Sequence, residues 1–261
     1  MEQSLQINDL FSVADKVVLV TGGSRGIGLM IAHGFVVNGA KVYISSRKTA
    51  VCDATAAELS KLGTCISVPA DLSTAEGRDK LVSRLKAEET SLDVLVNNAG
   101  AAWGAPFADY PESGYDKVMD INVKAIFMLT QSLLPLLEAN ASTANPARVI
   151  NIGSIDGIQV PNVDNYAYSA SKAAVHHLTK VLGVRLGRQG ITVNAIAPGP
   201  FASKMTAWML ENFQAQIEGR CPLGRIGQTA DMAGVALYLA SAAAAYVNGV
   251  VIPVDGGLHL A

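Results

Sequence analysis

Apolar positions along this 261-residue chain fall into short β-branched runs, separated by longer segments of helical character. An apolar run without polar alternation predicts a strand that is buried on both faces, as in a parallel sheet. We predict such strands at residues 17–21, 41–45, 65–70, 92–96 and 250–254. Helices are predicted at residues 29–37, 115–139 and 166–188.

The alternation of strands and helices predicts a single doubly wound α/β domain, with a parallel sheet of about seven strands and helices on both faces. We assign residues 16–261 to this domain and residues 1–15 to an N-terminal extension.

The first strand is followed directly by a glycine-rich segment, Gly22-Gly23-Ser24-Arg25-Gly26-Ile27-Gly28. Strand, glycine-rich turn and helix in this order predict a phosphate-binding unit of a dinucleotide site. Gly22 permits the tight turn, Gly26 lets the backbone approach the pyrophosphate, and Gly28 lets the helix pack on the strand. The free N–H groups at the start of the helix then face the phosphates.

The end of the second strand favours NADP(H) over NAD(H). An NAD site would present a carboxylate there to the ribose hydroxyls, but the chain has Ser46 and Arg47 instead. These two residues suit a 2′-phosphate, and Arg25 is placed to reach the same group. The alternative is that both arginines are ordinary surface residues.

Tyr168 and Lys172 are separated by one helical turn, so their side chains share a helix face. A fixed ammonium favours the phenolate and is expected to lower the tyrosine pKa towards neutrality, where acid–base catalysis works best. Tyr166 lacks such a partner, because Ala170 lies four residues after it. In isolation, the Tyr–Lys spacing is also typical of a solvated surface pair.

Taken in order, these motifs resemble the short-chain dehydrogenase/reductase family, from Lys16 to about Leu260. The resemblance is carried by the following segments: residues 21–28, Asn97-Asn98-Ala99-Gly100, Ser154, Tyr168, Lys172, Pro198-Gly199 and Asp255-Gly256-Gly257. It implies a Rossmann-type fold and hydride transfer between a nicotinamide cofactor and a carbonyl or alcohol.

The resemblance implies a catalytic set of Asn122, Ser154, Tyr168 and Lys172. Tyr168 would be the general acid in reduction and the base in oxidation, and Lys172 would lower its pKa and hold the nicotinamide ribose. Ser154 would hydrogen-bond the substrate carbonyl oxygen. Asn122 would link Lys172 through water to the proton supply; without the other three residues, a satisfied buried amide would be preferred.

The resemblance also implies cofactor contacts along much of the chain. Asp71 would contact the adenine amino group, and Ser203 keeps the hydroxyl of the family's usual threonine. The full predicted set is Gly22, Ser24, Arg25, Gly26, Ile27, Gly28, Ser46, Arg47, Asp71, Leu72, Asn98, Ala99, Gly100, Tyr168, Lys172, Pro198, Gly199 and Ser203.

Methionine and aromatic residues in the expected substrate loops and in a cap segment at about 200–225 predict a pocket for a partly apolar acyl chain or ring. We place Trp103, Asp156, Phe201 and Met205 in it. Within the family, Trp103-Gly104, residues 145–154 and residues 251–257 resemble the 3-oxoacyl-acyl-carrier-protein reductases of the rhamnolipid-biosynthesis type. That resemblance implies NADPH-dependent reduction of 3-oxoacyl thioesters, carried on an acyl-carrier protein or coenzyme A.

Asp156 leaves the substrate open, because an unpaired carboxylate beside an acyl chain is costly to bury. We favour a solvent-facing Asp156; the alternative is that it binds a hydroxyl group of a polyol, sugar or hydroxyketone. A third reading, a protein that senses NADP without turnover, is disfavoured by the intact catalytic set.

The remaining features exclude other classes. The net charge of −2 gives no basic face for nucleic acid, and no apolar segment reaches the ~20 residues needed to span a bilayer. Residues 1–15 lack the basic and apolar regions of a signal peptide. Cys52, Cys65 and Cys221 lack paired spacing, which predicts reduced thiols in a cytoplasmic protein without a metal site.

The predicted helices at residues 115–139 and 166–188 carry apolar or small residues around much of their circumference. Burial on one side would not require this. The family assembles through these two helices, so the resemblance implies a homotetramer, with a dimer as the alternative.

Overall fold

The apolar runs form the strands of a parallel sheet in the computed structural model, which describes residues 5–261. The strand order is β3-β2-β1-β4-β5-β6-β7, and the fold class predicted from the sequence is confirmed. The strands are β1 (Val17–Thr21), β2 (Lys41–Ser45), β3 (Cys65–Ser67), β4 (Val94–Asn97), β5 (Ala147–Ile152), β6 (Ile191–Pro198) and β7 (Val251–Val254).

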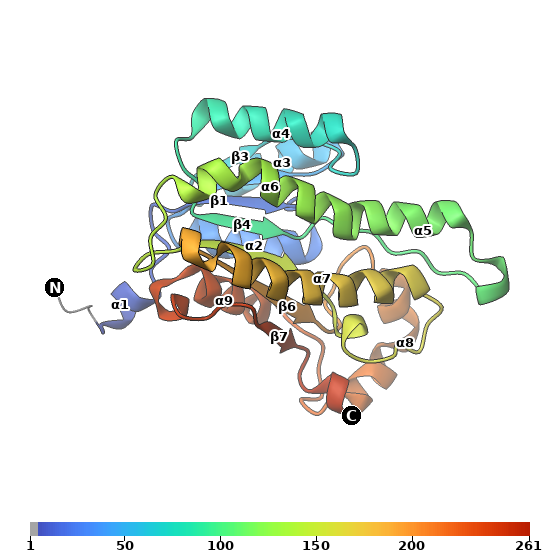
Figure 1. Ribbon diagram of the computed structural model, residues 1–261. Coiled ribbons are helices and arrows are strands. Elements are labelled where there is room, and N and C mark those ends of the chain that lie inside the picture. The colour runs from blue at the N-terminus through green and yellow to red at the C-terminus, as the bar shows by residue number, and fades with distance from the viewer. Residues whose placement is uncertain (1–4) are drawn as a thin grey trace.

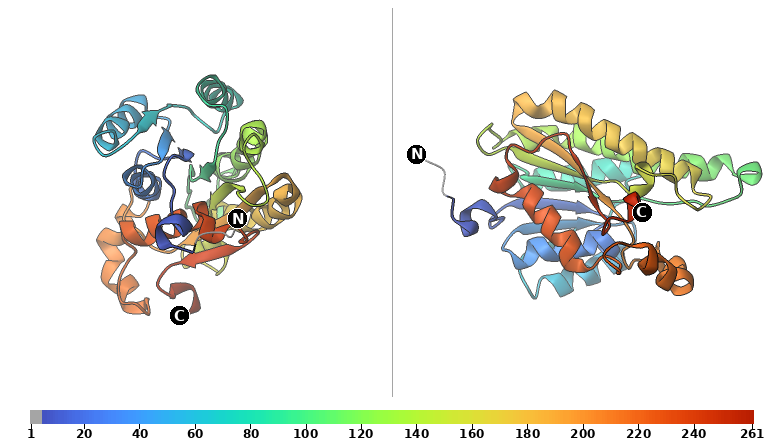
Figure 2. Two further views of the ribbon diagram at one scale, coloured as in Figure 1. Left: turned by 90° about the vertical axis from the view of Figure 1, so that its left-hand side faces the viewer. Right: turned by 90° about the horizontal axis from the view of Figure 1, so that it is seen from below.

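Helices cover both faces of the sheet, which explains why the central strands β4, β5 and β6 are buried along their whole length (Figures 1 and 2). One face carries α2 (Gly26–Val37), α3 (Thr49–Leu59) and α9 (Thr229–Ala240). The other face carries α4 (Ala75–Glu88), α6 (Ala125–Glu138) and α7 (Tyr166–Leu186).

The alternation of side chains along β1 fills both cores. Val18 and Val20 pack with Phe35 of α2, whereas Leu19 packs on the opposite face with Leu81 of α4. Burying a side chain of this size stabilises the fold by about 1.5–3 kcal/mol.

Two helices extend beyond the carboxyl end of the sheet (Figure 1). One is α5 (Glu112–Met119), which continues through a π-helical turn (Asp120–Lys124) into α6. The other is α8 (Ala207–Arg220), which lies in the predicted cap segment. All residues of α8 are described, and none of them is buried. At the other end of the molecule, the short helix α1 (Ile7–Leu10) belongs to the predicted N-terminal extension, of which residues 1–4 lie outside the described residues.

The strand order places the functional motifs at one edge of the sheet. The chain runs outward from β1 through β2 to β3, then returns beside β1 to begin β4. A crevice forms at the carboxyl ends of strands where the order reverses in this way. The glycine-rich segment follows β1, Asn98 follows β4 and Ser154 follows β5, so all three reach this edge.

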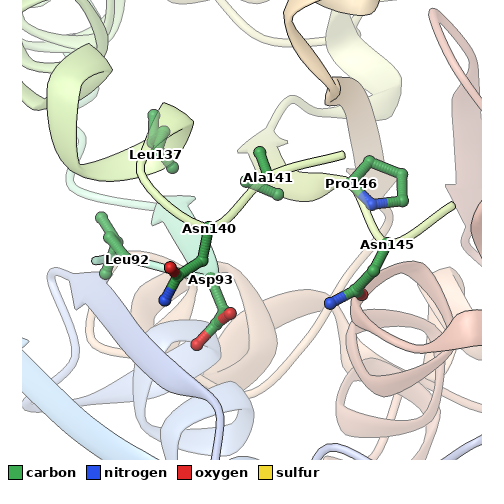
Figure 3. Close-up of a pocket in the computed structure, with 8 residues that line it drawn as sticks. Leu92, Asp93, Leu137, Asn140, Ala141, Asn145 and Pro146 are labelled. Atoms are coloured by element: carbon green, nitrogen blue, oxygen red, sulfur yellow. The ribbon is translucent and has the colours of Figure 1, made fainter. Parts of the chain in front are cut away.

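The opposite edge carries a narrow crevice between the start of β4 and the connection from α6 to β5 (Figure 3). Asp93 lines it, but its carboxylate already accepts a hydrogen bond from the Val17 N–H at 2.8 Å. Asn140 also lines the crevice and donates to Ser91 Oγ at 2.8 Å. These polar groups fasten strand starts and loops at the edge remote from the predicted site.

Predicted element bounds differ from the observed ones mainly at ends. The third strand stops at Ser67, although the Val68 N–H still donates to the Ile44 carbonyl of β2 at 2.9 Å. The helix predicted at 115–139 begins earlier, at Glu112, and includes the π-helical turn. The helix predicted at 166–188 ends at Leu186, followed by a turn of 3₁₀ helix.

Candidate active site

The glycine-rich segment forms an open cradle at the start of α2. Gly22 and Gly26 have φ angles of +66° and +52°, which favour glycine. A Cβ on Gly28 would lie 2.3 Å from the Gly22 carbonyl oxygen, so the helix could not approach the strand with a larger residue there. No side chain caps the first turn of α2, which leaves its N–H groups available to an anion. A cavity of about 370 Å³ opens beside Gly26.

Asn98 and Thr21 join this cradle to the end of β4. Asn98 Nδ2 donates to the carbonyl oxygens of Thr21 at 2.8 Å and Gly22 at 3.2 Å. In return, Thr21 Oγ1 accepts from the N–H groups of Asn98 and Ala99 at 2.9 and 3.0 Å. Thr21 is not among the predicted site residues. Its position at the end of β1, directly before the glycines, could have indicated its role.

The end of β2 presents groups that fit a 2′-phosphate. Ser46 Oγ is buried and makes no hydrogen bond within the described residues. Arg25 and Arg47 are both exposed, and the Gly22 N–H donates to the Ser45 carbonyl at 2.7 Å, which brings the cradle beside this strand end. A hydroxyl and two exposed arginines carried by these adjoining segments suit a phosphate dianion.

Asp71 and Leu72 follow β3 near the end of β2, because the Ala70 N–H donates to the Ser46 carbonyl at 3.2 Å. The two residues differ in which atoms could contact a cofactor. Asp71 is partly exposed, and its Oδ1 accepts from Ser73 Oγ at 2.7 Å. The Leu72 side chain is 4% exposed and packs in the core, so only its backbone can contact a cofactor.

The catalytic candidates of α7 lie beside the ends of β5 and its loop. Lys172 Nζ is 5.4 Å from the centre of the Tyr168 ring and donates to the Ile152 carbonyl at 2.7 Å. Ser154, directly after β5, is hydrogen-bonded to the Tyr168 side chain. The Ser154 Oγ also accepts from the Asp156 N–H at 3.1 Å, which restrains the hydroxyl.

The pKa of Tyr168 is raised in the structure, not lowered as we expected from the neighbouring Lys172. Burial raises the pKa of Tyr168 to about 12, while the hydrogen bond from Ser154 opposes that rise. Burial likewise lowers the pKa of Lys172 to about 8, against the attraction of Asp156. Desolvation therefore outweighs the Ser154 hydrogen bond, and this environment favours the protonated phenol of Tyr168 at neutral pH.

Asn122 lies in the π-helical turn and joins three segments. Its Oδ1 accepts from the Ala101 N–H at 2.9 Å, and its Nδ2 donates to the Ala101 carbonyl at 3.0 Å. Nδ2 also donates to Ser171 Oγ, next to Lys172, at 2.9 Å. The wide turn brings this fully buried amide between the loop after β4 and α7.

Asp156 is not the solvent-facing carboxylate that we favoured. It is partly buried, and its Oδ2 accepts from Asn165 Nδ2 at 2.9 Å. Burial raises its pKa, whereas the Asn165 hydrogen bond and the Lys172 charge lower it. The charge of the Asp156 carboxylate therefore acts on both Tyr168 and Lys172.

The predicted pocket residues differ in accessibility. Phe201 is 1% exposed and packs in the core against Gly227, so the prediction that its side chain lines the pocket is wrong. Trp103 packs on Gly114 of α5, with Lys117 Nζ 5.1 Å from its ring. Met205, which precedes α8, is 54% exposed, so its side chain is accessible to a substrate.

The segment after β6 lies against both the cradle and the C-terminal segment. A Cβ on Gly26 would be 3.0 Å from the Ser203 Cβ, which places the Ser203 side chain directly over the glycine-rich segment. Pro198 ends β6, and a Cβ on Gly199 would lie 2.6 Å from the Asp255 Cβ. The predicted cofactor contacts from this segment therefore reach the same edge as Gly26.

His176 was missed as a functional candidate. It lies one turn after Lys172, is 7% exposed, and accepts a hydrogen bond from the Ser154 N–H through Nε2 at 3.4 Å. Continuing the four-residue spacing from Tyr168 and Lys172 would have indicated it.

The described residues contain no group of three or more His, Cys, Asp and Glu side chains placed to hold a metal ion. Cys52, Cys65 and Cys221 are free and buried. Of the helices in residues 5–261, none has the length and apolar character that crossing a membrane requires.

Comparisons with known proteins agree with this geometry. Residues 22–259 match a family model described as enoyl-(acyl carrier protein) reductase. The chain is 49% identical over 252 residues to the rhamnolipids biosynthesis 3-oxoacyl-[acyl-carrier-protein] reductase of Pseudomonas aeruginosa, covering 96% of this chain and 98% of that protein. It is 34% identical over 259 residues to the 5-keto-D-gluconate 5-reductase of Escherichia coli K12, covering 98% of this chain and 100% of that protein.

Among solved structures, the Pseudomonas aeruginosa RhlG/NADP active-site complex matches with a TM-score of 0.93 and 48% identity. The match covers 96% of this chain and 98% of that one.

Proposed function

Since the chain belongs to the short-chain dehydrogenase/reductase family and is an NADP-dependent oxidoreductase, we propose that it reduces the 3-oxo group of an acyl thioester. The observation that carries this substrate class is the likeness, over almost the full length of both chains, to a 3-oxoacyl-[acyl-carrier-protein] reductase. The cradle and the unpartnered Ser46 hydroxyl support NADP(H) as the cofactor.

The catalytic residues suit reduction. NADPH, when bound, supplies the hydride that the carbonyl carbon accepts. The Ser154 hydroxyl would hydrogen-bond the carbonyl oxygen, and the Tyr168 phenol would donate its proton as charge develops there; the hydrogen bond between these two side chains supports the paired roles. Lys172 holds a positive charge beside the phenol ring, and Asn122 with Ser171 fixes the helix that carries both.

Acetoacetyl-coenzyme A and a longer 3-oxoacyl thioester test this proposal, beside diketones and ketoses, with NADPH oxidation followed by absorbance. We expect turnover that improves with acyl length. Tyr168→Phe should lose about 10²- to 10⁴-fold in kcat, because the proton donor is removed, while still binding NADPH. Turnover of polar ketones alone would overturn the thioester assignment.

A carrier protein would dock through exposed cations near the pocket. Arg225 is already engaged, since its guanidinium lies 2.6 and 3.0 Å from the two carboxylate oxygens of Asp231. Lys204 lies before α8 and Arg220 is the last residue of that helix, and both are exposed. We therefore propose the thioester as the recognised group, delivered on coenzyme A or on an acyl-carrier protein.

Asp156 favours a second candidate, an α-hydroxyketone or keto sugar. A partly buried carboxylate under the electrostatic influence of Lys172 is suited to accept a hydrogen bond from a substrate hydroxyl. The likeness to a 5-keto-D-gluconate 5-reductase supports the same class. Asp156→Ala distinguishes the two: loss of activity on polar ketones alone would favour this candidate, and unchanged activity on them would exclude it.

A further inference from the structure

His176 lies directly beneath the loop that carries Ser154. Its Nε2 accepts from the Ser154 N–H at 3.4 Å. A backbone N–H can only donate, so Nε2 carries no proton and the ring is neutral in this contact.

The same ring makes a second contact with the loop. It is hydrogen-bonded to the backbone of Gly157, which raises its pKa as donation to a carbonyl does. The Gly157 N–H is already used, because it donates to the Ser154 carbonyl at 3.0 Å. Nδ1 is then the ring nitrogen left to donate to the Gly157 carbonyl, and we infer that the ring bridges both ends of the short turn Ile155–Gly157.

Two glycines make room for this bridge. A Cβ on Gly153 would lie 2.1 Å from His176 Nε2, and one on Gly157 would lie 2.9 Å from its Cε1. Neither glycine has a positive φ, so close approach of the ring, and not backbone conformation, is what excludes a larger residue.

We propose that neutral His176 is a positioning residue, which holds the Ser154 hydroxyl in place for carbonyl binding by bridging the Ser154 N–H and the Gly157 carbonyl. This inference rests on the proposed function. His176 touches none of the reacting atoms and acts through the loop. A protonated ring would present a donor to the Ser154 N–H, so the bridge would open.

Several charged groups set how readily the ring takes a proton. Burial and the charges of Lys172 and Lys180 on α7 lower the pKa of His176. The loop above it carries Asp156, while β6, which packs against α7, has no titratable side chain. The bridge is therefore intact at neutral pH and opens in acid.

Three variants test the proposal: His176→Leu, His176→Gln and, as a matched control, His177→Gln at the exposed neighbouring position. We expect His176→Leu to lose at least about 10-fold in kcat with little change in KM for NADPH, since a displaced hydroxyl affects the chemical step. His176→Gln, whose amide can accept and donate, should restore most of kcat. In the wild type and in His177→Gln, kcat should fall once the pH drops below the pKa of a free histidine. In His176→Gln, kcat should not fall in that range.

The opposite results are equally informative. If His176→Leu keeps its kcat and only lowers the melting temperature, or if the acid loss persists in His176→Gln, the proposal is overturned and His176 is a packing residue. If the wild type turns over no carbonyl, the proposed function fails. Nitrogen NMR then tests the bridge independently of activity. A ring that carries its proton on Nδ1 and none on Nε2 supports the bridge, and an Nε2–H tautomer contradicts it.

Discussion

Ser46 and Arg47 concentrate the choice of cofactor in two adjacent side chains. Within residues 5–261, the Ser46 hydroxyl is buried without a hydrogen-bond partner, and the Arg47 guanidinium is exposed. A change at either position should therefore affect one cofactor more than the other.

We expect Arg47→Ala to raise the KM for NADPH by about 10-fold or more, because a charge-assisted contact to phosphate contributes at least about 1.4 kcal/mol. The KM for NADH should change little. Steady-state kinetics with both cofactors measures this, with Lys48→Ala as the control for loss of a neighbouring exposed cation. An equal effect on both cofactors would contradict the assignment.

The protonation state of Tyr168 predicts opposite pH behaviour for the two directions of reaction. Reduction needs the phenol, which persists at neutral pH because burial raises the Tyr168 pKa to about 12. Oxidation needs the phenolate, whose fraction grows about tenfold for each unit of pH below that value. We expect a level reduction rate through neutral pH and an oxidation rate that climbs into the alkaline range, measured as kcat in each direction. Tyr166→Phe, at an exposed tyrosine, should leave both profiles unchanged, and an oxidation rate indifferent to pH would exclude this account.

At the scale of elements, hydrogen bonds of the Asn122 side chain hold the π-helical turn between α5 and α6. Its amide satisfies the Ala101 N–H, the Ala101 carbonyl and the Ser171 hydroxyl, all from other segments. These partners would be left unpaired in the interior if the amide were removed.

Asn122→Ala should lower the free energy of unfolding by about 1–3 kcal/mol, the cost of leaving buried polar groups unsatisfied. It should also lower kcat, since Ser171 adjoins Lys172. Urea unfolding compared with Gln131→Ala, an exposed position on α6, measures the first effect. Should the two variants unfold alike, Asn122 would not be holding the turn.

Element types and the catalytic spacing followed from local pattern, whereas features set by distant contacts did not. The strand, glycine-rich turn and helix near Gly22 are encoded within consecutive residues, and so is the one-turn spacing of Tyr168 and Lys172. The π-helical turn depends on Ala101 and Ser171, far away in the chain. Phe201 is buried because Gly227 makes room for its ring, which no local pattern shows.

At the scale of the whole molecule, apolar side chains are left exposed on the face covered by α6 and α7. Phe127 is 43% exposed on α6, and Val181 and Val184 are 42% and 79% exposed on α7. This fits the homotetramer, or the alternative dimer, that the family resemblance implies; the assembly remains a prediction.

Val184→Glu should convert the assembly to a smaller species, because a carboxylate buried between subunits without a partner is costly. Sedimentation velocity measures the change. Val51→Glu, at an exposed valine of α3 on the opposite face, should sediment like the wild type. A monomeric wild type, or an unaltered Val184→Glu, would refute assembly through this face.

The division of the sheet at β1 and β4 has a consequence for how such an enzyme can change over time. The candidates for the adenine and its ribose phosphate follow β1 to β3, whereas Ser154 and Tyr168 follow β5. The two halves are joined where Asn98 bonds to Thr21 and Gly22. Substitutions at distant positions with no shared partner have additive effects. Cofactor preference and substrate range can therefore be inherited, exchanged or redesigned as separate traits, provided that the Asn98 junction is kept.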